Sequence, residues 1–193
     1  MSEQSLNHFS LISRLFGNLF YRAPTDPVLA GVFAWLQQNQ LSPIWPLETD
    51  KPSQQALEAL QMAVAPSALQ AEYEKLFGNA QQTGSVLTSL AAYEIDAEEF
   101  AAFRQMRAMP ALENHDNVAL LLLTASWIED NLDSTSAQQQ FFEQFLLPAM
   151  AKFLSKVETQ ASLPFYRTLA LLTRELLAAT ADELVDEDLD ETE

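Results

Sequence analysis

Cysteine is absent from the 193 residues, and glycine and histidine are scarce, with four and two copies. The absence of cysteine excludes disulfide bridges, thiol catalysis, and zinc or iron–sulfur sites with cysteine ligands. Four glycines leave little material for phosphate-binding loops, and two histidines leave little for imidazole chemistry. Composition therefore excludes much enzyme chemistry, and the missing cysteine fits a reducing cytoplasm.

Basic residues are also few, ten against 27 acidic ones, so the formal net charge is −17. Nucleic acid and anionic membranes attract Lys and Arg, so we expect neither as a partner. The longest apolar run, 118–123, is far shorter than the roughly 20 residues that cross a bilayer. The first ten residues lack the pattern of a secretory signal. We therefore expect a cytoplasmic protein.

Eight of the acidic residues lie between 182 and 193, in a stretch without a basic residue. We interpret residues 182–193 as a disordered, solubilising tail. The alternative is a tail that competes with a partner or shields a groove.

Helical patterns dominate the remainder, residues 1–181, and no segment alternates like a strand. Apolar residues recur at spacings of three and four, which predicts an all-α domain of roughly eight or nine helices. Asp26 and Asp96 are expected helix starts, Pro148 should kink or divide a helix, and the apolar stretch 118–128 should lie in the middle of the core. The polar stretch 79–89 reads as a linker, so we expect two lobes with a boundary near 79–95.

Catalytic motifs are not recognisable. The stretch 78–85, GNAQQTGS, has one residue too many between its glycines for a phosphate loop and no lysine. Glu113 and Asp116 are three apart and would share the face of a helix, where they could bind a hard cation or do acid–base work. Capping of the helix that follows is the favoured interpretation of this pair. We therefore expect no metal, no cofactor and no enzyme activity.

Aromatic residues indicate a binding role instead. Tyr73, Phe77, Trp127 and the aromatic residues near 141–145 and 165–166 could line an apolar groove for a peptide, although their helical spacing is equally typical of a core. By elimination, a binding or chaperone function ranks above catalysis.

Several segments in order resemble the TorD/DmsD-type redox-enzyme maturation chaperones. They are residues 15–24 (LFGNLFYRAP), 44–47 (IWPL), 73–78 (YEKLFG), 113–117 (ENHDN) with 125–127 (ASW), 145–148 (FLLP) and 163–167 (LPFYR). The likeness covers about residues 6 to 180, and the acidic C-terminus resembles one subgroup of the family.

The resemblance implies an all-helical, cytoplasmic chaperone. Family members bind an apo-metalloenzyme, typically a molybdopterin oxidoreductase, or its twin-arginine signal peptide, until the cofactor is inserted. Carried over residue by residue, the client-binding residues would be Glu113, His115, Asp116 and Asn117 together with Tyr73, Leu76 and Phe77. The expected state is a monomer, and a domain-swapped dimer is the alternative.

Two departures from the family pattern lie where the signal peptide is thought to dock. The family carries Glu-Pro-x-Asp-His where this chain has Asn114 and Asn117 around Asp116, and the linker, QQTGSVL over 81–87, lacks the usual proline and tryptophan. A different client, such as a cytosolic metal-dependent hydrolase, is the alternative hypothesis. A hydrolase that itself uses Glu113 and Asp116 is the third.

Overall fold

The computed structural model describes residues 3–62, 64–112, 114–132 and 134–190. Over these ranges the chain is built from helices, and Gly78 and Thr83 form an isolated bridge rather than a strand. The α-helices are α1 (Glu3–Tyr21), α2 (Ala30–Gln37), α3 (Lys51–Leu60), α4 (Pro66–Phe77), α5 (Ala97–Met106), α6 (Leu120–Asn131), α7 (Thr135–Phe141), α8 (Leu147–Gln160) and α9 (Pro164–Asp190). The predicted all-α fold is confirmed.

Short polar side chains start several of these helices. Asp26 accepts a hydrogen bond from the amide of Val28 at 2.9 Å and opens the 3-10 turn Pro27–Leu29 that leads into α2. Asp96 accepts from the amides of Glu98 and Glu99 at the start of α5. Both starts agree with the prediction, because an aspartate side chain satisfies amides that have no partner inside the helix.

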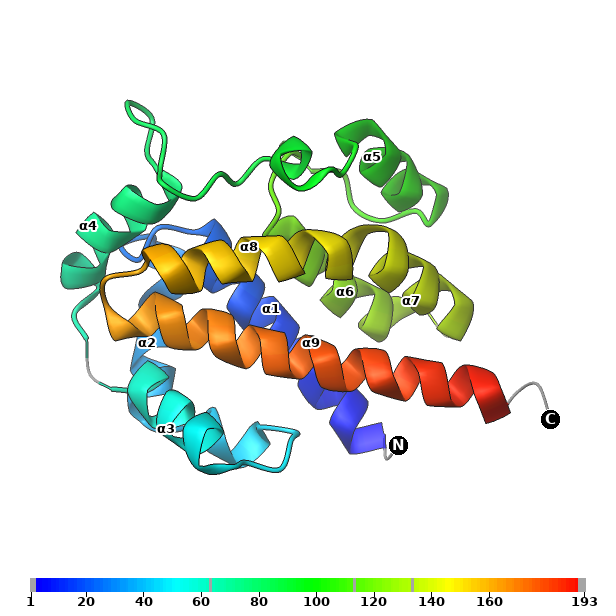
Figure 1. The fold of residues 1–193 in the computed structure, drawn as a ribbon, viewed down its shortest axis with the longest axis horizontal. Coiled ribbons are helices and arrows are strands. Elements are labelled where there is room, and N and C mark those ends of the chain that lie inside the picture. The colour runs from blue at the N-terminus through cyan, green and yellow to red at the C-terminus, as the bar shows by residue number, and fades with distance from the viewer. Residues whose placement is uncertain (1–2, 63, 113, 133, 191–193) are drawn as a thin grey trace.

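The helices pack as a bundle in which segments distant in sequence are neighbours. Figure 1 shows α8 and α9 running antiparallel side by side, with α1 behind them and α3 below α9. Helix α1 packs along α6, and its predicted apolar stripe, which includes Phe9, Ile12 and Phe16, is buried there. Helix α6 buries most of its side chains, as expected for a helix that is apolar on nearly all sides.

Pro148 follows a change in helix type. The residues Phe142–Leu146 form a π-helical turn, η4, between α7 and α8, and Pro148 lies in the first turn of α8. A π-turn changes the hydrogen-bond pattern, and α8 begins after it. Proline is tolerated in the first turn of a helix, because the N–H groups there have no acceptor inside the helix. The expected division at Pro148 is therefore confirmed, with the chain remaining helical from α7 through α8.

The segment predicted as a linker is ordered and takes part in the core. Val86, Leu90 and Tyr93 are buried, and they belong to one apolar cluster with side chains from α1 to α4 and from α5 to α9. Leu90–Tyr93 forms a 3-10 turn, η3, that the sequence did not indicate. The division into two lobes stays a prediction.

Helix α9 extends into the acidic C-terminus. It ends at Asp190, so residues 182–190 of the predicted tail are helical, and residues 191–193 lie outside the described part of the chain. In the described ranges, no helix combines the length and apolar character needed to span a membrane.

Candidate functional site

The first group of predicted site residues lies at the C-terminal end of α4. Leu76 is fully buried, whereas Tyr73 and Phe77 are half-buried and belong to an aromatic cluster. The Phe77 ring lies 5.1 Å from the Tyr73 ring and 5.5 Å from the Tyr166 ring, centroid to centroid. Edge-to-face contacts of this kind stabilise helix packing beyond the apolar area that they bury. Leu76 is thus a core residue, and Tyr73 and Phe77 are only partly exposed.

Tyr73 has a defined polar contact inside this cluster. Its hydroxyl donates a 2.9 Å hydrogen bond to the carbonyl of Tyr21 at the end of α1. Burial, assisted by the nearby Tyr21 and Asp26, raises the pKa of Tyr73 to about 12. The phenol is therefore neutral at physiological pH and acts as a hydrogen-bond donor that ties α4 to α1.

The linker folds back along the end of α4. The amide of Ser85 donates to the Lys75 carbonyl at 3.0 Å, and the amide of Val86 donates to the Leu76 carbonyl at 2.7 Å. Gly84 makes this return path feasible, because a Cβ at this position would lie 2.2 Å from the Leu76 carbonyl oxygen. The first residues of the linker are thus fixed against the same helix end that carries the aromatic cluster.

The second group of predicted residues lies in the loop before α6. The Asp116 side chain accepts a 2.7 Å hydrogen bond from the amide of Leu90, 26 residues away at the start of η3. Two residues on, the amide of Val118 donates to the carbonyl of Thr88 at 2.7 Å. The loop and the far end of the linker are therefore joined by two hydrogen bonds.

Asp116 does not cap α6, which corrects the favoured sequence interpretation. The N-cap residue of α6, Ala119, has no side-chain cap, and in the turn before the helix the side-chain oxygen of Asn117 accepts from the amide of Ala119 at 2.9 Å. Asp116 lies in an irregular loop, so the prediction that it lies on a helix is wrong. Glu113 itself lies outside the described residues.

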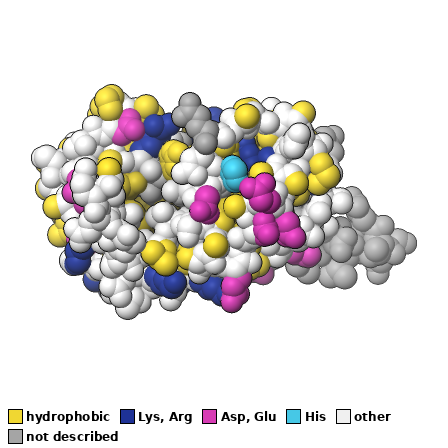
Figure 2. All heavy atoms as spheres, turned by 90° about the horizontal axis from the view of Figure 1, so that it is seen from above, with side chains coloured by type: hydrophobic (Ala, Val, Ile, Leu, Met, Phe, Trp, Pro, Cys, Tyr) yellow, Lys and Arg dark blue, Asp and Glu magenta, His cyan; other side chains and the backbone are white. Residues whose placement is uncertain are grey.

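His115 lies between these elements and α5. Its Nε2 atom is 3.7 Å from Oε1 of Glu98, and its side chain is half-exposed. Asp116 next to it is exposed, with one carboxylate oxygen held by Leu90. Figure 2, which views the molecule from above Figure 1, shows acidic side chains gathered beside a histidine. The exposed carboxylate of Asp116 thus lies directly beside the backbone of the linker.

The two groups are therefore connected by the linker. Residues 85–86 are hydrogen-bonded to the end of α4, and residues 88–90 are hydrogen-bonded to the loop before α6. Between them, Leu87 projects an apolar side chain that is 46% exposed. We call this surface, made of Leu87, His115, Asp116 and Glu98, the linker face.

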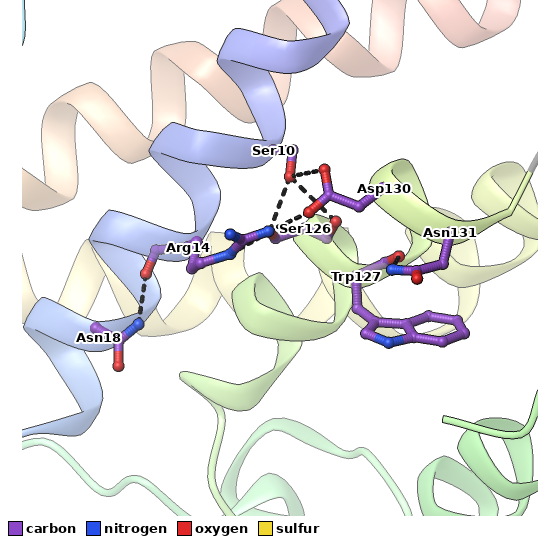
Figure 3. Close-up of polar contacts among 7 residues, drawn as sticks. All are labelled: Ser10, Arg14, Asn18, Ser126, Trp127, Asp130 and Asn131. Carbon is purple, nitrogen blue, oxygen red and sulfur yellow. Dashed lines mark hydrogen bonds and ion pairs between the residues drawn. The ribbon is translucent and has the colours of Figure 1, made fainter. Parts of the chain in front are cut away.

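A polar network between α1 and α6 was not predicted. Figure 3 shows Ser10 and Arg14 of α1 pointing toward Ser126 and Asp130 of α6. The Ser10 hydroxyl lies 2.6 Å from Oδ1 of Asp130 and 3.0 Å from the Ser126 hydroxyl, and Arg14 pairs with Asp130. The signal was available, because each helix places two polar residues four apart at the edge of its apolar stripe.

Metal binding finds no support within the described ranges. No group of three or more histidine, aspartate or glutamate side chains is placed there to hold an ion. Because Glu113 lies outside those ranges, the structure does not test its pairing with Asp116.

No protein-family model matches the chain. A protein of Haemophilus influenzae named only as uncharacterized is 62% identical, over 97% of this chain and 100% of its own length. The chaperone protein YcdY of Escherichia coli is 36% identical, over 96% of this chain and 100% of its own length. The probable Tat proofreading chaperone DmsD of Haemophilus influenzae is 23% identical, over 89% of both chains.

Proposed function

Because this chain belongs to the TorD/DmsD-type family of redox-enzyme maturation chaperones, we propose that it binds the unloaded form of a molybdopterin oxidoreductase, or that enzyme's twin-arginine signal peptide, in the cytoplasm. The chaperone keeps the client open until its cofactor is inserted. It works by binding, and no catalytic step of its own is required.

The observation that carries this proposal is the linker face. A signal peptide of this type presents two arginines followed by an apolar stretch. Asp116 offers an exposed carboxylate in a fixed position, and an arginine guanidinium can pair with a carboxylate through two parallel hydrogen bonds. Leu87 lies on the linker, which is hydrogen-bonded to Asp116 through Leu90, and its exposed side chain offers an apolar contact. The negative net charge also favours the approach of a basic peptide.

Calorimetric titration tests this proposal directly. The ligand is a peptide with two consecutive arginines and an apolar tail, and the matched control carries two lysines in their place. We expect the arginine peptide to bind more tightly, because lysine keeps the positive charge but lacks the planar guanidinium that can donate two parallel hydrogen bonds to a carboxylate. Absence of heat for several such peptides would exclude clients of the exported type.

A second client class is favoured by one observation from the comparisons. Haemophilus influenzae contains both the relative that is 62% identical to this chain and a probable DmsD that is 23% identical to it. Two relatives of this chain in one organism suggest two different clients. The alternative proposal is a client outside the exported oxidoreductases, and the hypothesis from the sequence is a cytosolic metal-dependent hydrolase.

Affinity capture separates the two client classes. The full chain is used as bait in the cytosol of its own host, and wild-type and Asp116→Asn baits are compared. Recovery of an apo-oxidoreductase with a signal peptide supports the first proposal. Recovery of a hydrolase without one supports the second.

A further inference from the structure

A buried arginine of α5, which also lies over the Phe100 ring at 5.8 Å, has no acidic partner among the described residues. Arg104, near the end of α5, is only 9% exposed. Its guanidinium donates to the Thr124 hydroxyl and, at 2.9 Å, to the Pro110 carbonyl. Both acceptors are neutral, and none of the ion pairs among the described residues involves Arg104.

Burial of this charge carries a cost that the two neutral contacts offset only in part. A charged group that leaves water is normally paired with an opposite charge, because the low-dielectric interior disfavours an isolated ion. Burial accordingly lowers the pKa of Arg104, although guanidinium groups remain charged in proteins. The position therefore carries a positive charge for which a bound anion would be a favourable partner.

Arg104 lines a cleft of about 410 Å³ between α5 and the segment that leads to α6. This volume is in the range of small-molecule sites, which combine an apolar wall with a few polar groups. The remaining lining residues are Ala101, Gln105, Ala108, Met109, Pro110, Ala111, Leu112 and His115, and His115 also belongs to the linker face, so the two surfaces adjoin there. Most of them are apolar, so the cleft suits a ligand with one charged end and an apolar body.

One edge of the cleft is the C-terminal end of α5. Ala108 follows the last turn with a φ of 54°, and the amide of Met109 donates to the carbonyl of Arg104 at 3.1 Å. Together these features form a Schellman cap, a common way for an α-helix to end. The cap fixes the backbone beside Arg104 at this edge of the cleft.

The charge balance selects the ligand class. Arg104 supplies one positive charge in a protein whose net charge is −17, so a phosphate dianion would keep an uncompensated charge in the cleft. A carboxylate carries a single charge and matches the fork of a guanidinium. We propose that this cleft binds a carboxylate attached to an apolar group, from either a small organic acid or the free C-terminus of a peptide.

Nuclear magnetic resonance titration of the full chain tests this proposal and distinguishes the two sources. The small probes are hexanoate and its neutral analogue hexanamide. The peptide probes are N-acetyl-Ala-Ala-Leu with a free carboxylate and the same peptide with a C-terminal amide. We expect each acid to bind at least ten-fold more tightly than its amide, with shifts concentrated in residues 101–112. The tighter-binding acid identifies the source.

Two variants distinguish a binding role from a structural role of Arg104. Arg104→Met removes the charge and should weaken acid binding at least ten-fold, but this change could also unfold α5. Ala101→Leu leaves Arg104 in place and fills the cleft, so it should weaken binding to a similar extent. Ala102→Leu, on the exposed side of the same helix, is the matched control and should bind like the wild type.

The outcomes that overturn the proposal are equally defined. Absence of saturable shifts with both acids, or equal affinity for acid and amide, shows that Arg104 only holds the end of α5 through its hydrogen bonds. Equal binding by the Ala101→Leu and Ala102→Leu variants shows that any bound acid lies elsewhere. Failure of the proposed client to bind leaves this test unaffected, because the cleft is probed with its own ligands.

Discussion

Substitution of Asp116 separates two roles that this side chain combines in the structure. It accepts a hydrogen bond from the amide of Leu90, a residue with no exposed surface, and it presents a negative charge on the linker face. Asp116→Ala removes both the acceptor and the charge. Asp116→Asn keeps an oxygen acceptor in nearly the same place and removes only the charge.

The magnitudes follow from the fate of the Leu90 amide. Without an acceptor this buried donor loses its partner, which costs about 1–3 kcal/mol. With a slope of about 2 kcal/mol per molar urea, the midpoint of unfolding should fall by about 0.5–1.5 M in Asp116→Ala. Asp116→Asn exchanges a charged acceptor for a neutral one, so we expect a loss of about 1 kcal/mol or less.

The two variants should differ in stability but not in peptide binding. If Asp116 pairs with an arginine of the client, both variants lose the ion pair, and both should bind the arginine peptide about ten-fold or more weakly. The assays are urea unfolding followed by circular dichroism and calorimetric titration with the peptide. Wild-type affinity in the Asp116→Asn variant would refute the charge role. Wild-type stability in the Asp116→Ala variant would refute the structural role.

Three further predictions concern the fold. Gly84→Ala should destabilise the protein by several kcal/mol, because its Cβ would lie 2.2 Å from the Leu76 carbonyl oxygen, and thermal unfolding measures the loss. Gly31→Ala is the matched control: a Cβ there meets nothing within 4 Å, so the same assay should show a gain of about 0.5–1 kcal/mol. The free energy of unfolding should fall as the pH rises from 10 to 12. Burial raises the pKa values of Tyr73 and Tyr93 from 10.0 to about 12, so the folded state holds these protons more tightly than the unfolded state does. Tyr73→Phe should make the fall shallower in urea titrations at pH 10–12, and an unchanged profile would show that Tyr73 does not contribute.

The helices could be predicted because their signals are local. A cap such as Asp26 acts within a few residues, and the apolar stripe of α1 depends on a repeat of 3.6 residues. Helix α3 follows the same rule, because Asp50 caps it and it begins at Lys51. The turn Leu90–Tyr93 was missed because its order depends on contacts with distant residues.

The site was predictable only in part, for the same reason. The role of Asp116 in client binding stays a prediction. Its hydrogen-bond partner, Leu90, lies 26 residues away, and no sequence spacing indicates it. The expected capping of α6 was wrong, because the N-cap residue Ala119 has no side-chain cap. Arg104 carried no sequence signal, since an arginine near the end of an amphipathic helix is ordinarily a solvent-exposed residue.

The hydrogen bonds along the linker also determine how readily two copies could exchange parts. An exchange across residues 79–95 requires the release of four bonds, donated by the amides of Ser85, Val86, Leu90 and Val118. At about 1 kcal/mol each, their loss alone costs about 4 kcal/mol and makes the open form about a thousand-fold rarer than the closed one. Exposure of the buried side chains Val86, Leu90 and Tyr93 makes the open form rarer still. Swapped dimers would therefore accumulate slowly and be isolated as a kinetically trapped species, and Asp116→Ala should speed their appearance in size-exclusion chromatography.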